Sequence, residues 1–337
     1  MRHRGIVAGT ADTIDAVPAA PLYPDTVPLR THTLPVGDGH VLHVQEHGHF
    51  DGLPALVLHG GPGSGCSPLL RRFFDPARFR VICVDQRGAG LSTPRGAIEH
   101  NTTGHLLGDL RRLREQLGIT SWLVVGGAWG ASLALAHAAA EPQAVAGLLL
   151  RASFLARPED IDAFFAPART DEREAWERFA SVARPQARDA LLPFLARRFA
   201  LDGRAACRPL AQAWWEWEQF LATGAQAPSP PTGEALEALV DRYRVQSHYL
   251  VHRCWLEAPS LLERCDAVPR VPTLLLHGRQ DRICRPDGAL ALHRNLPGSE
   301  LRWVDAAGHD PVHPAMAAST VAALDHWATY ADLGAGR

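Results

Sequence analysis

The stretch that decides the fold is Trp122-Leu123-Val124-Val125-Gly126-Gly127-Ala128-Trp129-Gly130-Ala131-Ser132-Leu133-Ala134-Leu135. Its first four residues form an apolar run, which predicts a short buried strand. A tight turn with glycine on either side of Ala128 follows, and the small and apolar residues after it predict a helix.

The turn has the frame of a nucleophile elbow, the strand-to-helix turn whose pattern is G-x-S-x-G. Here the frame is G-x-A-x-G, because Ala128 stands at the central position. The glycines that the turn needs are present, and the hydroxyl that would attack a substrate is not. A functional interpretation has to explain both facts.

The composition is that of an ordinary globular protein. The chain has 337 residues, of which 46% are hydrophobic and 21% charged, and its formal net charge is −2. This balance gives no electrostatic reason to expect nucleic acid or a membrane as a partner. The N-terminus lacks the apolar segment of a signal peptide, and no run of about 20 apolar residues occurs. We therefore expect a cytoplasmic protein.

The six cysteines indicate neither a disulfide framework nor a metal site. They are scattered, and none forms a C-x-x-C pair or has metal-ligand spacing with histidine. Reduced thiols are expected in the cytoplasm. We expect no metal and no cofactor.

Alternating apolar and helical segments predict a mostly parallel, doubly wound α/β sheet. Residues 1–28 lack periodicity and are expected to form an N-terminal arm. A hairpin is predicted over 29–46, around an Asp-Gly turn. Further strands are expected at residues 55–58, 79–84, 146–150, 271–278 and 301–304, and helices at 106–117 and 315–330.

Between two of these strands the pattern changes. From about residue 154 to 259 no strong strand is found, and amphipathic segments rich in tryptophan predominate. This predicts an all-helical cap over 152–260, inserted into an α/β core made of 29–151 and 261–337.

Three residues follow successive predicted strands in the order of a hydrolytic triad. A triad needs a nucleophile, an imidazole that takes its proton and a carboxylate that holds the imidazole. In an α/β-hydrolase fold the order along the chain is nucleophile, acid, base. Ala128, Asp281 and His309 occur in that order, each after a strand. Alone, Asp281 would be a turn carboxylate and His309 a loop histidine; together they predict the triad geometry.

Backbone N–H groups could form an oxyanion hole beside the elbow. One candidate donor is Trp129, at the start of the elbow helix. The other is Gly60 or Gly61, in the sequence His59-Gly60-Gly61-Pro62-Gly63. A phosphate-binding loop is the competing interpretation of these glycines, but neither G-x-G-x-x-G nor a P-loop lysine follows.

Several motifs together resemble one family. They are the HGGPG sequence at 59–63, DQRGAGLS at 85–92, NTT at 101–103, GGAWG at 126–130, AW at 213–214 with WE at 217–218, and GRQD at 278–281. In this order they are similar to the proline iminopeptidases (prolyl aminopeptidases), α/β-hydrolases that remove an N-terminal proline or small residue. The resemblance extends from about residue 30 to the C-terminal helix.

The resemblance implies roles for individual residues. Ala128 occupies the place of the nucleophilic serine, Asp281 that of the acid and His309 that of the base. Members of the family bind the free amino group of the substrate with glutamate side chains of the cap. Glu218 matches the first of these, and Gln246 stands where the second is expected. The pair still offers two hydrogen-bond acceptors, but only one of them carries a full negative charge.

Trp214, Trp215 and Trp217 have two open interpretations. They could wall an apolar substrate pocket, with Trp217 binding the substrate, or they could pack the cap against the core.

Two explanations of Ala128 compete. In the first, alanine is an engineered replacement for serine in a serine aminopeptidase that acts through an acyl-enzyme. In the second, the chain is naturally inactive and binds amines or peptides. For an active enzyme, the runner-up substrate is an aminoacyl group on a non-peptide small metabolite. In each case the expected partner is a peptide or an aminoacyl small molecule with a free N-terminus.

Overall fold

The computed structural model describes residues 22–166, 169–225 and 229–334. Most of the predicted arm, residues 1–21, lies outside the described residues, and residues 22–28 form neither helix nor strand. The described part contains an eight-stranded sheet with the order β1-β2-β4-β3-β5-β6-β7-β8. The strands are β1 (Arg30–Gly37), β2 (His40–Gly48), β3 (Leu53–Leu58), β4 (Phe79–Val84), β5 (Trp122–Gly127), β6 (Val145–Arg151), β7 (Thr273–Gly278) and β8 (Ser299–Val304).

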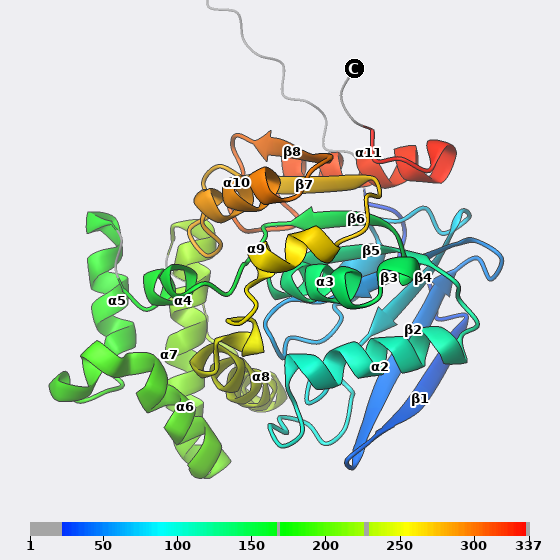
Figure 1. The fold of residues 1–337 in the computed structure, drawn as a ribbon. Helices are drawn as coiled ribbons and strands as arrows, with labels where there is room; N and C mark the ends of the chain where they lie inside the picture. The colour runs from blue at the N-terminus through cyan, green and yellow to red at the C-terminus, as the bar shows by residue number, and fades with distance from the viewer. Residues whose placement is uncertain (1–21, 167–168, 226–228, 335–337) are drawn as a thin grey trace, which may run out of the picture.

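The sheet is parallel from β4 to β8. The hairpin of β1 and β2 is antiparallel and joins β4 in antiparallel register, whereas all the later pairs run parallel. Helices connect the parallel strands and lie on both faces of the sheet (Figure 1). The predicted α/β-hydrolase fold, with its mostly parallel, doubly wound sheet, is confirmed.

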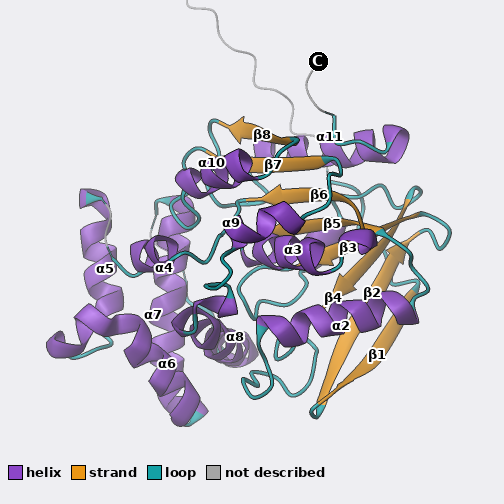
Figure 2. Ribbon diagram, viewed as in Figure 1, coloured by secondary structure: helices purple, strands orange, loops and turns teal. Residues whose placement is uncertain are grey.

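Helices and strands separate clearly in Figure 2. The helices of the sheet region are α1 (Pro68–Arg71), α2 (Thr103–Gln116), α3 (Trp129–Ala140), α9 (Leu261–Arg264), α10 (Pro286–Asn295) and α11 (Pro314–Tyr330). Between β6 and β7 lie α4 (Pro158–Phe164), α5 (Arg173–Ala180), α6 (Leu191–Leu201), α7 (Arg204–Thr223) and α8 (Gly233–Val251). Within the described residues no strand interrupts this helical segment. Helix α10 was not foreseen from the sequence.

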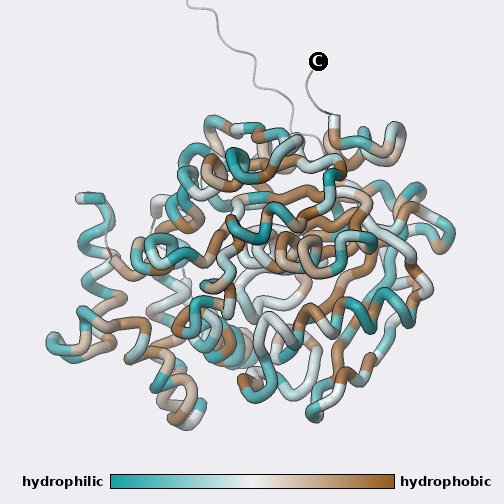
Figure 3. The backbone as a smooth tube through the Cα atoms, in the orientation of Figure 1, coloured by the Kyte–Doolittle hydropathy of each residue, from teal (hydrophilic) through white to brown (hydrophobic). Residues whose placement is uncertain are grey.

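Alternation along the central strands divides the core into two layers. Leu56 and Leu58 of β3 pack in a cluster that also includes residues of α2, of α3 and of the helical segment between β6 and β7, which is the cap. Ala55 and Val57 point to the other face, where α11 supplies Met316. Apolar residues accordingly run through the centre of the fold in Figure 3, while polar residues lie on its outside. None of the helices in the described residues combines the length and the apolar character that a membrane crossing requires.

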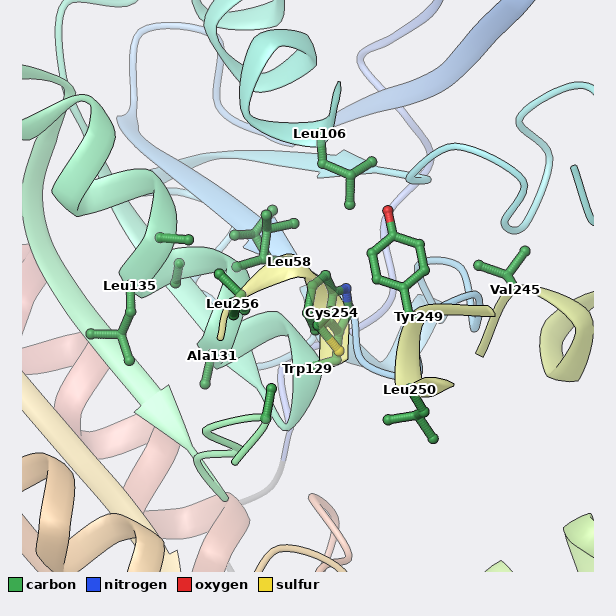
Figure 4. Packing of buried hydrophobic residues seen from close by; sticks show 14 of the residues in the cluster. Leu58, Leu106, Trp129, Ala131, Leu135, Val245, Tyr249, Leu250, Cys254 and Leu256 are labelled. Carbon is green, nitrogen blue, oxygen red and sulfur yellow. The ribbon is translucent and has the colours of Figure 1, made fainter. Parts of the chain in front are cut away.

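The cap folds around aromatic side chains of α7 and α8. Trp214 stacks on Tyr243 with ring centroids 4.8 Å apart, and Trp217 stacks on Phe179 at 6.2 Å. Burying aromatic rings of this size is the largest apolar contribution that a small helical unit can make. Helix α8 also reaches the core, since the Tyr249 ring lies edge-on to Trp129 at 5.1 Å. Figure 4 shows these two rings side by side, with Leu58 and Val245 nearby.

Candidate active site

The elbow has the sharp geometry that its glycines allow. Ala128 has φ 51° and ψ −119°, and α3 begins at the next residue. A Cβ on Gly126 would lie 2.3 Å from the carbonyl oxygen of Gly130, and one on Gly130 would lie 2.1 Å from that of Leu58. Only glycine fits at either position. A non-glycine residue in such a conformation costs about 1–3 kcal/mol, and that strain is characteristic of functional sites.

Asp281 and His309 meet beside this turn. The His309 Nδ1 lies 2.9 Å from Oδ2 of Asp281. The other carboxylate oxygen accepts hydrogen bonds from the backbone N–H groups of Ile283, at 2.9 Å, and Cys284, at 2.8 Å. Asp281 is therefore held on both oxygens, and it holds the imidazole in turn.

The environment keeps Asp281 ionised. Burial alone would raise the pKa of this carboxyl, but His309 and the backbone hydrogen bonds outweigh that effect and lower the pKa below its ordinary value. A buried carboxylate that orients an imidazole and stabilises its protonated form is the arrangement required for general-base catalysis. The pair of Asp281 and His309, the dyad, can therefore take a proton from a nucleophile.

One cavity of about 180 Å³ joins the elbow to the dyad and the cap. Its lining includes six of the residues predicted for the site: Gly61, Ala128, Trp129, Glu218, Gln246 and His309. Asp281 lies behind His309, 4% exposed. Gly60 is next to the elbow, because a Cβ built on it would lie 3.7 Å from that of Ala128. Apolar side chains of Phe154, Ile161, Phe164 and Leu250 complete the walls.

Backbone donors for an oxyanion are available at the elbow. Trp129 is the first residue of α3, where N–H groups have no partner within the helix and the helix dipole favours negative charge. The Trp129 side chain is fixed, since its Nε1 donates to Oε1 of Gln86 at 2.8 Å. Gln86 in turn donates to the carbonyl oxygen of His59 at 3.1 Å. This chain of contacts ties the HGGPG loop to the elbow.

Trp217 lies elsewhere. It is 1% exposed, its Nε1 donates to the carbonyl oxygen of Phe164 at 2.9 Å, and it is not among the described residues that line the cavity. The structure thus places it in the aromatic core of the cap, which is the packing alternative considered for these tryptophans. Trp214 is likewise fully buried.

Glu218 and Gln246 come together in the cavity, with a neighbour that the sequence analysis missed. Gln246 Nε2 donates to Oε1 of Glu218 at 2.9 Å. The Oε2 atom of Glu218 accepts from Nη2 of Arg242 at 2.7 Å and from the phenol Oη of Tyr243 at 2.9 Å. Arg242 could have been found from its position four residues before Gln246, since residues i and i+4 share one face of a helix.

The described residues that line the cavity include no serine, threonine or lysine that could replace the missing nucleophile. Ser132 donates its hydroxyl to the carbonyl oxygen of Phe154 inside the helix packing, and Ser92 donates to that of Asp85. The thiol that lines the cavity is Cys284, whose pKa burial raises well above its ordinary value. A thiol held in its protonated form is a poor nucleophile.

One group of side chains could hold a metal ion, at a distance from the elbow cavity. The ligand atoms of Asp38, His100 and His105 all lie within 4.8 Å of one another, between the β1–β2 turn and the start of α2. Asp38 also faces Arg87, whose Nη1 is 3.4 Å from Oδ2. None of the three lines the elbow cavity, so an ion there would not touch a substrate bound at Ala128.

Comparison with known proteins agrees with this fold. Residues 54–314 match the family model described as alpha/beta hydrolase fold. A solved structure titled VinJ covers 86% of this chain and 94% of its own, with 21% identity and a TM-score of 0.61. The elbow, the Asp281–His309 pair and the cap therefore define an α/β hydrolase.

Closer relatives narrow the family. A probable proline iminopeptidase of Leptolyngbya boryana is 36% identical over 309 residues, which are 91% of this chain and 96% of that protein. The proline iminopeptidase of Arabidopsis thaliana is 37% identical over 90% of this chain and 80% of its own. The crystal structure of the Mycobacterium smegmatis proline iminopeptidase has a TM-score of 0.57 at 21% identity, covering 90% of this chain and 100% of its own. The chain belongs to the proline iminopeptidase family of α/β hydrolases.

Proposed function

We propose that this chain carries the site of a serine exopeptidase of the prolyl aminopeptidase type, in a form that Ala128 makes inactive. The substrate is an amide that follows an N-terminal proline or small residue. The observation that carries the proposal is the hydrogen bond between His309 and Asp281 in the cavity that Ala128 lines. The family relationship supports the same chemistry.

With serine at position 128, each residue of the site has a part in the reaction. The serine Oγ attacks the carbonyl carbon while His309 takes its proton. The N–H of Trp129 and one from the Gly60–Gly61 segment stabilise the negative oxygen that forms. Collapse breaks the C–N bond, and His309 gives the proton to the leaving amine. Water then cleaves the acyl-enzyme with His309 again as the base, which releases the acid and restores serine.

Alanine stops this sequence at the binding step. Without an Oγ atom no acyl-enzyme forms, and loss of the nucleophile costs about 10⁶-fold in turnover in a comparable serine hydrolase. The cavity, the dyad and the strained turn remain. The chain therefore binds substrate without cleaving it.

The size of the cavity supports a small acyl group. Its volume of about 180 Å³ suits one compact side chain, and its lining combines apolar side chains with polar residues of the cap such as Glu218 and Gln246. An aminoacyl group on a non-peptide metabolite would occupy the same space, so it remains the second substrate class.

The test is the Ala128→Ser variant, assayed on the naphthylamides of proline and alanine and on an aminoacyl ester. We expect turnover to rise by several orders of magnitude, with the amides of proline and alanine both cleaved. The control is the same variant carrying His309→Ala, which should return to background. No gain over the Ala128 chain would contradict the hydrolase proposal and favour an amine-binding protein without activity.

A further inference from the structure

Arg242 lies in the part of the cavity where Glu218 and Gln246 are expected to bind the amino group of a substrate. It lies on α8, four residues before Gln246, and both side chains line the cavity. The guanidinium donates from Nη2 to Oε2 of Glu218 at 2.7 Å and from Nε to Oε1 of Gln246 at 3.4 Å. One arginine therefore contacts both of the residues expected to bind an amino group.

The backbone of Arg242 lies directly against the HGGPG loop, residues 59–63. A Cβ built on Gly63 would lie 2.8 Å from the carbonyl oxygen of Arg242 and 3.0 Å from Cβ of Val245. Helix α8 thus packs directly on the HGGPG loop, without space for a side chain between them. The hydrogen bonds to Glu218 and Gln246 then direct the guanidinium into the cavity.

The negative charge of Glu218 is already compensated. A carboxylate offers about four lone-pair positions, and three of those on Glu218 are used by Arg242, Tyr243 and Gln246. Glu218 and Arg242 are both largely buried, with side chains 8% and 26% exposed. Burial alone would lower the pKa of Arg242, but Glu218 raises it above its ordinary value. The pair is thus an ion pair with no net charge.

The guanidinium also keeps donors to spare. Arginine has five N–H groups, and the contacts with Glu218 and Gln246 use one on Nη2 and the one on Nε. Within the described residues, Nη1 has no hydrogen-bond acceptor from the protein. An oxygen atom of a bound acyl group can accept from it, whereas an ammonium group has no lone pair with which to accept.

We propose that Arg242 is a specificity-determining residue that cancels the charge of Glu218, so that the site accepts uncharged acyl groups and does not require a free N-terminus. The inference rests on the proposed function only in placing the acyl part of the substrate in this cavity. It extends the substrate class to amides and esters whose acyl group carries no positive charge.

Binding to the chain as it stands tests this without turnover, because Ala128 prevents cleavage. The probes are L-prolinamide, which is cationic at pH 7, and cyclopentanecarboxamide, its uncharged isostere. Calorimetry gives the dissociation constant of each and hence their ratio. We expect the two constants to agree within about tenfold, since Glu218 is paired with Arg242. Asp160, the other carboxylate among the described residues that line the cavity, is paired with Arg157.

Two variants shift the ratio in opposite directions. Arg242→Met leaves the charge of Glu218 uncompensated, and it should favour prolinamide by about tenfold or more relative to its isostere. Glu218→Gln leaves Arg242 as an unpaired cation and should disfavour prolinamide by a similar factor. Arg208→Met is the matched control, because Arg208 pairs with Glu237 at an exposed position and its loss should leave the ratio unchanged.

The outcomes separate the two proposals. If both amides bind and the ratio moves as stated in either variant, the role of Arg242 is supported. If both bind and neither variant changes the ratio, or if the unaltered chain prefers prolinamide by more than a hundredfold, that role is overturned while the proposed function stands. If neither amide binds, the placement of the acyl group in this cavity is rejected and the role of Arg242 with it, whereas the turnover of the Ala128→Ser variant still decides the proposed function.

Discussion

Arg151 donates a hydrogen bond of 2.8 Å from Nη1 to the carbonyl oxygen of His309. Arg151 is the last residue of β6, so the sheet itself fixes the main chain of the candidate base. Asp281 fixes the ring of the same residue through Nδ1. His309 is therefore held at two points, by a cation behind its backbone and by an anion beside its imidazole.

Removing the contact from Arg151 should misplace the base. In the Ala128→Ser background, Arg151→Met is expected to lower kcat by between about ten- and a hundredfold, because small displacements of a catalytic group are costly. KM should change little, since Arg151 is not among the described residues that line the elbow cavity. A rise in KM at constant kcat would show that Arg151 acts on binding instead.

Replacing the acid tests the other point of attachment. Asp281→Asn in the same background should lower kcat by about 10⁴-fold, because asparagine favours the wrong tautomer of His309 and does not stabilise its protonated form. Steady-state kinetics on proline naphthylamide measure the effect. Activity within tenfold of the Ala128→Ser variant would mean that His309 works without its carboxylate.

The DQRG sequence has a structural role that predicts an effect on stability. Arg87 donates to both oxygens of Asp109, at 2.7 and 2.8 Å, and both side chains are buried. Burial raises the pKa of Asp109. Arg87→Met should lower the free energy of unfolding by about 3–5 kcal/mol, because a buried carboxylate loses its partner.

The double variant Arg87→Met with Asp109→Leu supplies the control for that pair. It should recover part of the loss, since no uncompensated charge remains. Urea denaturation of the two variants compares them directly. Equal destabilisation would show that packing rather than charge explains the effect.

His137 predicts how stability depends on pH. It is buried on α3, where Nε2 accepts from Nε1 of Trp122 at 3.2 Å, and burial lowers its pKa to about 4. The unfolded chain, with a pKa of about 6.5, takes up the proton first. The contribution to stability is thus complete above pH 6.5 and is lost as the pH falls from 6.5 towards 4, by about 3 kcal/mol in all.

The variant His137→Gln keeps an acceptor for Trp122 but does not titrate. The difference in unfolding free energy between the two proteins, measured by urea denaturation from pH 7.5 to 4.5, should follow the stated window. A difference that stays constant with pH would contradict a neutral, buried His137.

Much of the site was predictable because its residues follow strands. The carboxyl ends of neighbouring parallel strands meet at one edge of a sheet, so Asp281 after β7 and His309 after β8 were expected beside the elbow. Gly126 and Gly130 were equally informative, because only a close backbone approach explains them. The expected strands were all found, at nearly the expected residues.

The cap was harder to interpret, because helix periodicity does not say which neighbours a side chain meets. For Trp217 a place in the pocket and a place in the packing of the cap were both open, and the structure packs it against Phe164 and Phe179 inside the cap. Arg242 was missed, because arginine on an amphipathic helix is ordinarily a solvated residue. Its partner Glu218 lies on another helix, and only the packing of α7 against α8 brings the two together.

The central claim is that the elbow, Asp281 and His309 form a hydrolytic site that lacks only the nucleophilic oxygen. The most direct measurement is the reaction of the Ala128→Ser variant with a fluorophosphonate, followed by the mass of the intact protein and of its peptides. We predict one adduct per chain, located at residue 128, with none on the Ala128 chain and a rate that falls by about 10³-fold or more when His309→Ala is added. Labelling that is absent, or that is unaffected by His309→Ala, would contradict the account.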